Sequence, residues 1–114
     1  MLTREDVVEQ FNEWMTNLEN ALNKKDGNDL SESTRMVLAF ALILHAYFPD
    51  TLTYEIGQRM KELFAKSLAC VTEQLDNGIN PDGCYDLYQR NIHERLEKLE
   101  ELGRAWWTEI PPSA

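Results

Sequence analysis

The side chains best suited to acid–base or metal chemistry in this sequence are its two histidines, His45 and His93. His93 and Glu97 have the i, i+4 spacing that places two residues on one face of a helix, where both could bind a metal ion. Two ligands do not make a site, and no His-Glu-x-x-His or Glu-x-x-His motif accompanies them. His45 interrupts an apolar segment, so we expect a core histidine with a hydrogen-bond partner. The histidines therefore predict neither a metal site nor a cofactor.

The two cysteines, Cys70 and Cys84, stand on either side of an expected turn at residues 78–83. Their distances from the centre of that turn differ by about one helical turn, which exceeds what disulfide geometry tolerates. The sequence also lacks Cys-x-x-Cys motifs, serine-hydrolase elbows, phosphate-binding loops, dinucleotide fingerprints and EF-hand loops. We therefore expect free thiols and a protein that is not an enzyme. A small metal-binding protein or enzyme that uses His93 and neighbouring carboxylates stays open as an alternative.

Charge narrows the choice of partner. The chain has 11 Lys and Arg against 20 Asp and Glu, a formal net charge of −9. Nucleic acids and anionic membranes bind basic surfaces, so we expect neither as a direct partner. An acidic surface suits high solubility or a basic protein partner.

No segment of the sequence resembles a targeting signal or a membrane span. The N-terminal residues lack the apolar stretch of a signal peptide. The most apolar run, residues 36–48, contains His45 and is shorter than the roughly 20 residues that cross a bilayer. We therefore expect a cytoplasmic protein, in which the cysteines would stay reduced.

Apolar residues recur with the helical period along three segments, and a fourth, residues 36–44, is apolar at every position. The alanine and leucine content of that fourth segment favours a helix over a strand. Short polar links between long helices favour antiparallel neighbours. The sequence thus predicts an all-α fold, an antiparallel bundle of about four helices in a single domain over residues 1–114. The expected helices are approximately 4–25, 33–48, 53–77 and 81–109.

Glycine, proline and polar capping residues set these boundaries. We expect Gly27 and Gly78 to end helices, and Pro49 to stop the apolar helix. The following helices should begin at side-chain caps supplied by Ser31 or Ser33, by Thr51 or Thr53, and by Asn80.

Glu5, Glu9 and Glu13 form an acidic face on the expected first helix, at successive i, i+4 positions without an interleaved lysine. Like charges at this spacing destabilise a helix by roughly 0.2–0.5 kcal/mol per pair. The face is either the solvated side of an acidic protein or a docking surface for a basic one. Trp107 lies beside the apolar stripe of the last helix, where it could rim a contact surface or cover the end of the bundle. These four residues are the candidate partner-binding residues.

The expected second helix is apolar on all sides, with Leu38 and Leu42 opposite Phe40 and Ile43. A bundle helix normally buries one stripe and exposes its other side to water. Either the remaining helices surround this one, or part of it meets a second chain, so a homodimer stays open.

Compact acidic helical proteins that neutralise basic toxins or nucleases have this general character, and the likeness is one of fold and charge alone. We therefore expect a non-enzymatic protein-binding inhibitor, such as an immunity or anti-defence protein. It would dock Glu5, Glu9 and Glu13 on a basic partner. The alternative of a different kind is a homodimeric structural or regulatory adaptor that uses the apolar surface of the second helix.

Overall fold

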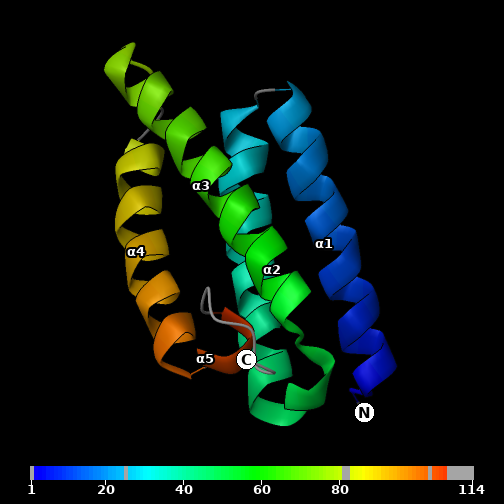
Figure 1. Ribbon diagram of the computed structural model, residues 1–114. Helices are drawn as coiled ribbons and strands as arrows, with labels where there is room; N and C mark the ends of the chain where they lie inside the picture. Colours follow the sequence, from blue (N-terminus) through cyan, green and yellow to red (C-terminus); the bar gives the residue numbers. More distant parts are fainter. Residues whose placement is uncertain (1, 25, 81–82, 103, 108–114) are drawn as a thin grey trace.

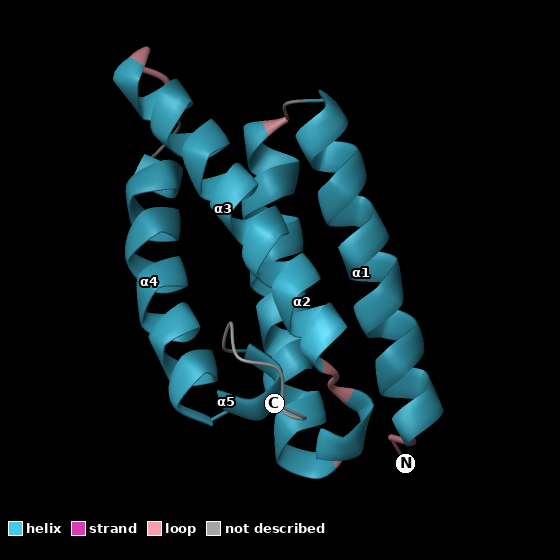
Figure 2. Ribbon diagram, viewed as in Figure 1, coloured by secondary structure: helices cyan, strands magenta, loops and turns pink. Residues whose placement is uncertain are grey.

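Helices account for nearly all of the chain that the structure describes. The structure is a computed structural model, and it describes residues 2–24, 26–80, 83–102 and 104–107 (Figure 1). The helices are α1 (Arg4–Lys24), α2 (Gly27–Tyr47), α3 (Tyr54–Asp76), α4 (Cys84–Leu102) and α5 (Arg104–Trp107), with a 3-10 turn at Pro49–Thr51. No strand occurs within these ranges (Figure 2), and the all-α prediction is confirmed.

The four long helices run alternately up and down the molecule (Figure 1). α1 and α2 form an antiparallel pair, α3 returns across α2, and α4 descends on the other side of α3 from α1. The short α5 then turns across the lower end of the bundle. This is the antiparallel arrangement that short connections between long helices predict.

α2 begins at Gly27, earlier in the chain than the predicted start at residue 33. Its cap is Asp26, whose carboxylate accepts hydrogen bonds from two amides in the first turn at 3.1 and 3.2 Å. Ser31 and Ser33, the predicted caps, therefore lie inside the helix. Gly27 was expected to end the first helix, but it opens the second, where a Cβ would lie 1.9 Å from the Tyr85 hydroxyl. The glycine permits a close approach between α2 and α4.

The predicted bounds of the third helix are confirmed to within one residue. The Thr53 hydroxyl caps α3 by accepting a hydrogen bond from the amide of Ile56 at 3.3 Å. Beyond Asp76 the chain reaches Gly78 with φ 78°, a left-handed conformation that glycine adopts without steric cost.

The predicted fourth helix, residues 81–109, is two helices rather than one. α4 begins at Cys84, where the Asn80 side chain accepts a hydrogen bond at 3.0 Å from an amide of the first turn. It ends at Leu102, and the sequence has a glycine at position 103, a residue that costs roughly 1 kcal/mol relative to alanine inside a helix. Residues 81, 82, 103, 108 and 109 of the predicted helix lie outside the described residues.

Two buried tryptophans hold α5 against α3. Gly57 of α3 makes room for them, since a Cβ there would lie 1.6 Å from the carbonyl oxygen of Trp106. The ring of Trp107 packs on Phe64, with centroids 6.2 Å apart, and on Trp106 at 5.5 Å. Burying both indoles stabilises the contact between α5 and α3, because each removes a large apolar area from water.

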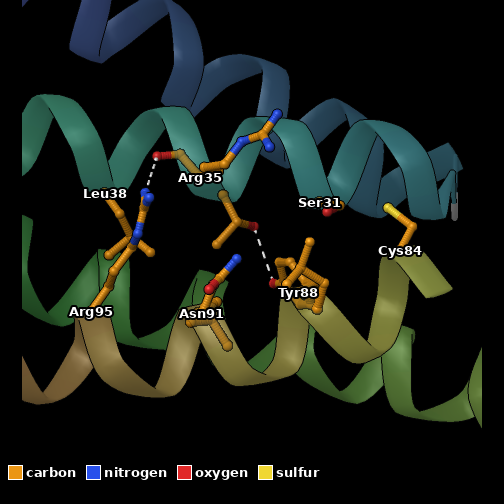
Figure 3. A pocket seen from close by; sticks show the side chains of 10 residues that line it. Ser31, Arg35, Leu38, Cys84, Tyr88, Asn91 and Arg95 are labelled. Carbon is orange, nitrogen blue, oxygen red and sulfur yellow. Dashed lines mark hydrogen bonds between the residues drawn. The ribbon is translucent and has the colours of Figure 1, made fainter.

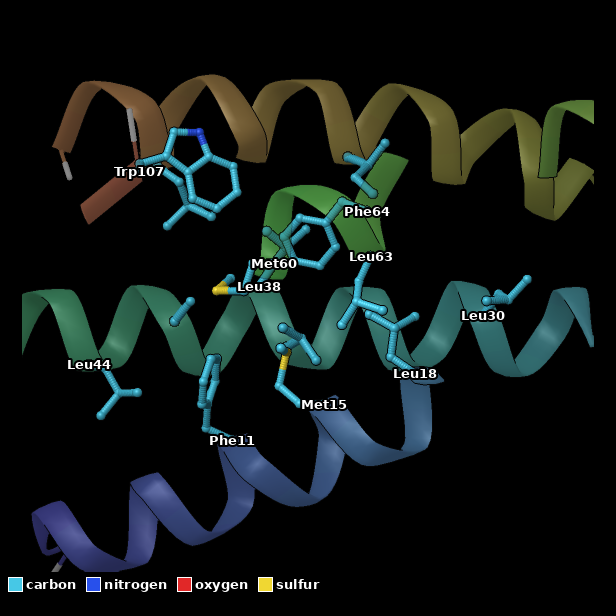
Figure 4. Close-up of a cluster of buried hydrophobic side chains, with 14 of the residues drawn as sticks. Phe11, Met15, Leu18, Leu30, Leu38, Leu44, Met60, Leu63, Phe64 and Trp107 are labelled. Carbon is cyan, nitrogen blue, oxygen red and sulfur yellow. The ribbon is translucent and has the colours of Figure 1, made fainter. Parts of the chain in front are cut away.

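α2 lies at the centre of the bundle and packs against α1, α3, α4 and the 3-10 turn. Figure 4 shows side chains from α1 and α3 converging on it. The fully buried side chains of this core include Leu18, Leu30, Leu38, Leu44, Met60, Phe64, Ile92 and Leu99. The apolar character of α2 on all sides follows from this central position.

Candidate functional site

The predicted acidic face is exposed along α1. Glu5, Glu9 and Glu13 are all open to solvent, on the side of the helix opposite the buried stripe of Val7 and Phe11. The polar and exposed Thr16 and Asn20 continue this side toward the end of the helix. We call the surface formed by Glu5, Glu9, Glu13, Thr16 and Asn20 the outer side of α1.

The acids at the centre of the outer side of α1 form no ion pair with any described residue. Glu5 lies 3.9 Å from Arg4, and both side chains are exposed, so the pair contributes little. Glu19, on the flank of the helix, pairs with Arg59 of α3. Within the described residues Glu9 and Glu13 form no ion pair. Their negative charge is therefore available to a basic partner.

The exposed side of α4 is also acidic, but its charges are mixed. Glu94, Glu97 and Glu101 alternate along it with the exposed Arg90 and Lys98. Opposite charges at i, i+4 positions attract and lower the net field of a helix face. The outer side of α1 is thus the more uniform of the two acidic surfaces.

Trp107, the fourth residue selected from the sequence, lies in the core. Its side chain is 4% exposed and packs against Phe64 and Trp106, with the Lys61 ammonium 5.9 Å from its ring centroid. It covers the end of the bundle, which is the other role that the sequence left open. It lies apart from the three glutamates and is not part of the contact surface proposed below.

The apolar residues of α2 lie mostly inside the bundle. Between Met36 and Leu44 every side chain is buried or half-buried. Only Tyr47, at the end of the helix, is a large and exposed apolar side chain of α2. The central position of α2 accounts for its composition, and the homodimer stays a prediction.

The two histidines have different environments. His45 is half-buried, and its Nε2 forms a 2.5 Å hydrogen bond with the carbonyl oxygen of Leu102, as expected of a histidine in an apolar helix. His93 and Glu97 are both exposed on α4. In the part of the chain that the structure describes, no three His, Cys, Asp or Glu side chains gather closely enough to hold a metal ion.

Both cysteines are free thiols and half-buried. Cys70 accepts a long hydrogen bond of 3.7 Å from Gln74 on its own helix. Cys84 opens α4 and faces the gap between α4 and α2 (Figure 3).

This gap is a groove that the sequence did not predict. It is lined by side chains between residues 31 and 38 of α2 and between residues 84 and 95 of α4, and its cavity volume is about 50 Å³ (Figure 3). We call it the α2–α4 groove. Arg95 reaches across one end of it, where a guanidinium nitrogen donates to the carbonyl oxygen of Arg35 at 3.4 Å. The sequence shows that Arg35 and Arg95 each lie next to the apolar stripe of a helix. It does not show that the two helices pack together and bring these residues to one groove.

Three buried hydroxyl groups join α2, α3 and α4, and two of them, those of Thr34 and Tyr88, belong to residues that line the α2–α4 groove. Ser67 of α3 lies 3.0 Å from Thr34 of α2 and 2.6 Å from Tyr88 of α4. Tyr88 also donates to Thr34 at 3.3 Å. Burial raises the pKa of Tyr88, and the hydrogen bonds with Ser67 and Thr34 partly oppose that effect. No histidine or carboxylate is among the described residues that line the groove.

Comparison with known proteins adds no relative. No protein family, curated protein sequence or solved structure matches this chain. None of the described helices combines the length and apolar character that crossing a membrane requires. The fold and its surface therefore define an all-α helical bundle with an acidic outer helix.

Proposed function

We propose that this protein is a non-enzymatic binding protein, and that the outer side of α1 docks on a basic surface of a partner protein. The observation that carries the proposal is the exposure of Glu5, Glu9 and Glu13 in one row, with no cation paired to the last two in the described structure. The three carboxylates repel one another in the free protein, and the positive charges of a basic partner would offset that repulsion and attract the helix.

Inhibition is the form of binding that we favour. Basic surfaces on toxins and nucleases serve to contact polyanionic substrates, and an acidic helix can occupy the same surface. Steering by opposite charge would also speed the encounter. On this proposal the protein acts in the cytoplasm as an immunity or anti-defence protein, where the free Cys70 and Cys84 would stay reduced.

A double charge reversal tests the docking surface. Glu9→Lys with Glu13→Lys changes the charge of the outer side of α1, and Glu97→Lys with Glu101→Lys makes the same change on α4. Both pairs are exposed and spaced i, i+4, so each double substitution relieves one like-charge repulsion and should leave the fold intact. The second variant is therefore a control matched in charge, spacing and exposure.

The measurement is capture of partners from an extract of the source organism, followed by association rates for each captured protein at two salt concentrations. We expect the α4 variant to retain the partner and the α1 variant to lose about tenfold or more of the association rate at low salt. The salt dependence should also flatten for the α1 variant. Equal rates for the two variants would refute docking through α1.

A further inference from the structure

A pocket lies between α1 and α2, at the end of the bundle where α1 ends and α2 begins (Figure 1). Its cavity volume is about 200 Å³, against about 50 Å³ for the α2–α4 groove. It is lined by side chains between residues 14 and 24 of α1 and between residues 29 and 33 of α2, and we call it the α1–α2 pocket. Asn20 belongs both to this pocket and to the outer side of α1, and Asn17 of the pocket follows Glu13 by one helical turn. The pocket therefore continues the acidic surface proposed for docking.

Trp14 adds an aromatic side chain to the α1–α2 pocket. It is half-buried, packs against the core and lines the pocket. Trp106 and Trp107, in contrast, are buried at the opposite end of the bundle. The face of an indole ring attracts cations, and in proteins the cation is more often arginine than lysine. An aromatic side chain beside an acidic row thus favours a cationic occupant.

Two carboxylates of α2 line the same pocket. Asp29 and Glu32 are exposed, and neither forms an ion pair within the described ranges. Lys24 is the one base among the described lining residues, so two acids stand against one base there. Lys24 is itself exposed and unpaired with these acids, and its flexible side chain can keep the ammonium in water when another cation enters.

The hydroxyl group of Ser33 lacks a partner among the described residues. The side chain is 3% exposed and lines the α1–α2 pocket. Buried polar groups normally form hydrogen bonds, so this hydroxyl is open to a group that enters the pocket. Asn17 and Asn20 add side-chain amides that no described hydrogen bond uses. Together with the two carboxylates, these oxygens can accept the five N–H donors of a guanidinium, whereas an ammonium has only three.

We propose that the α1–α2 pocket receives an arginine side chain of the basic partner. The inference rests on the proposed docking of α1, and it adds the anchor of that contact. The guanidinium would lie against Trp14 and pair with Asp29 and Glu32, a combination that lysine does not reproduce. Arginine and tryptophan are enriched among the residues that dominate binding energy at protein interfaces. A cavity of about 200 Å³ suits a single side chain rather than a larger ligand.

Hexa-arginine and hexa-lysine separate recognition of the guanidinium from attraction by charge, because the two peptides carry the same charge. Titration calorimetry of the full chain at one salt concentration should show hexa-arginine bound at least about threefold more tightly. Glu32→Gln should bring the ratio of the two affinities toward one. Glu100→Gln, which removes an exposed carboxylate from α4, should leave the ratio unchanged. Equal ratios in the two variants would overturn the arginine anchor.

The indole N–H resonance of Trp14 reports the contact in the unmodified chain. In the ¹⁵N-labelled protein this signal, assigned by its loss in Trp14→Phe, should shift more with hexa-arginine than with hexa-lysine. The signals of the buried Trp106 and Trp107 should stay in place. Shifts of the α1 amides with an unmoved Trp14 signal would overturn the arginine anchor and leave docking through α1 intact. Absence of binding by both peptides would overturn the anchor and the docking together.

Discussion

The outer side of α1 and the α2–α4 groove carry opposite charges on one small acidic chain. Glu5, Glu9 and Glu13 stand in a row on a single helix, and their placement needs only the helical period. The groove needs α2 and α4 to be packed together, with Arg95 reaching from one to the other. The first surface should therefore survive any change that leaves α1 folded, whereas the second depends on how α4 is anchored. Changes in the anchoring of α4 should separate the two surfaces.

The largest effect on stability is expected from truncating the buried leucine of α4. Leu99 is 0% exposed, and Leu99→Ala should lower the free energy of unfolding by about 2–5 kcal/mol, because it removes buried methyl groups and leaves a cavity. Chemical denaturation measures the change. The matched control is Leu102→Ala near the end of the same helix, where the side chain is 44% exposed and the change should be within about 0.5 kcal/mol. Similar values for the two variants would contradict the packing of α4.

A smaller loss of stability is expected from a substitution that moves α5 away from α3. In Gly57→Ala the new Cβ would lie 1.6 Å from the backbone oxygen of Trp106, so α5 must move. Overpacking of this kind costs about 1–3 kcal/mol, against roughly 1 kcal/mol gained from the helix propensity of alanine. Tryptophan fluorescence during denaturation should report both the destabilisation and greater exposure of the indoles.

Gly27→Ala supplies the comparison for that variant. Its Cβ would meet side-chain atoms of Tyr85 and Gln74 rather than a backbone atom. We expect a smaller destabilisation than for Gly57→Ala. A Gly57→Ala variant more stable than the natural protein would disprove the close contact between α3 and α5.

The hydroxyl groups under the groove should contribute least of the three anchors. Tyr88→Phe removes two hydrogen bonds but leaves Thr34 and Ser67 bonded to each other at 3.0 Å, so the cost should be about 1 kcal/mol. A loss of several kcal/mol would show that the hydroxyl cluster, and not apolar packing, fixes α4.

The same variant has a distinct pH dependence. Burial raises the pKa of Tyr88 above its ordinary value of 10.0, so the folded state keeps this proton at a pH where the unfolded state releases it. The stabilisation is therefore complete below about pH 10 and falls as the pH rises beyond it. Urea denaturation at about pH 8 and about pH 10.5 should show a larger loss for the natural protein than for Tyr88→Phe. Equal losses would contradict the burial of this hydroxyl.

Local patterns predicted what a single helix determines. The apolar stripes located the helices, and Thr53 and Gly78 marked the ends of α3, because caps and glycine turns act on the adjacent backbone. The acidic row on α1 could also be predicted from the sequence, since i, i+4 spacing alone defines it.

Features that depend on contacts between distant helices could not be predicted from the sequence. Gly27 signals a helix end in isolation, yet the Asp26 cap and the neighbouring Tyr85 place it inside α2. The sequence placed Trp107 among the partner-binding candidates, whereas in the structure α5 packs its ring on Phe64. Arg35 and Arg95 are 60 positions apart, and only the packing of α2 against α4 brings them to one groove.

The central claim is that α1 presents the surface for a basic partner, and nuclear magnetic resonance tests it residue by residue. Titrating hexa-arginine into the ¹⁵N-labelled chain should shift the amides of residues 5–20 first and most strongly, because Glu9 and Glu13 are exposed and form no ion pair with the residues that the structure describes. Those shifts should vanish in the Glu9→Lys, Glu13→Lys variant and persist in the Glu97→Lys, Glu101→Lys control. Shifts of equal or greater size over residues 94–101 would contradict the account, since they would show that the mixed charges of α4 attract a basic chain as well as α1 does.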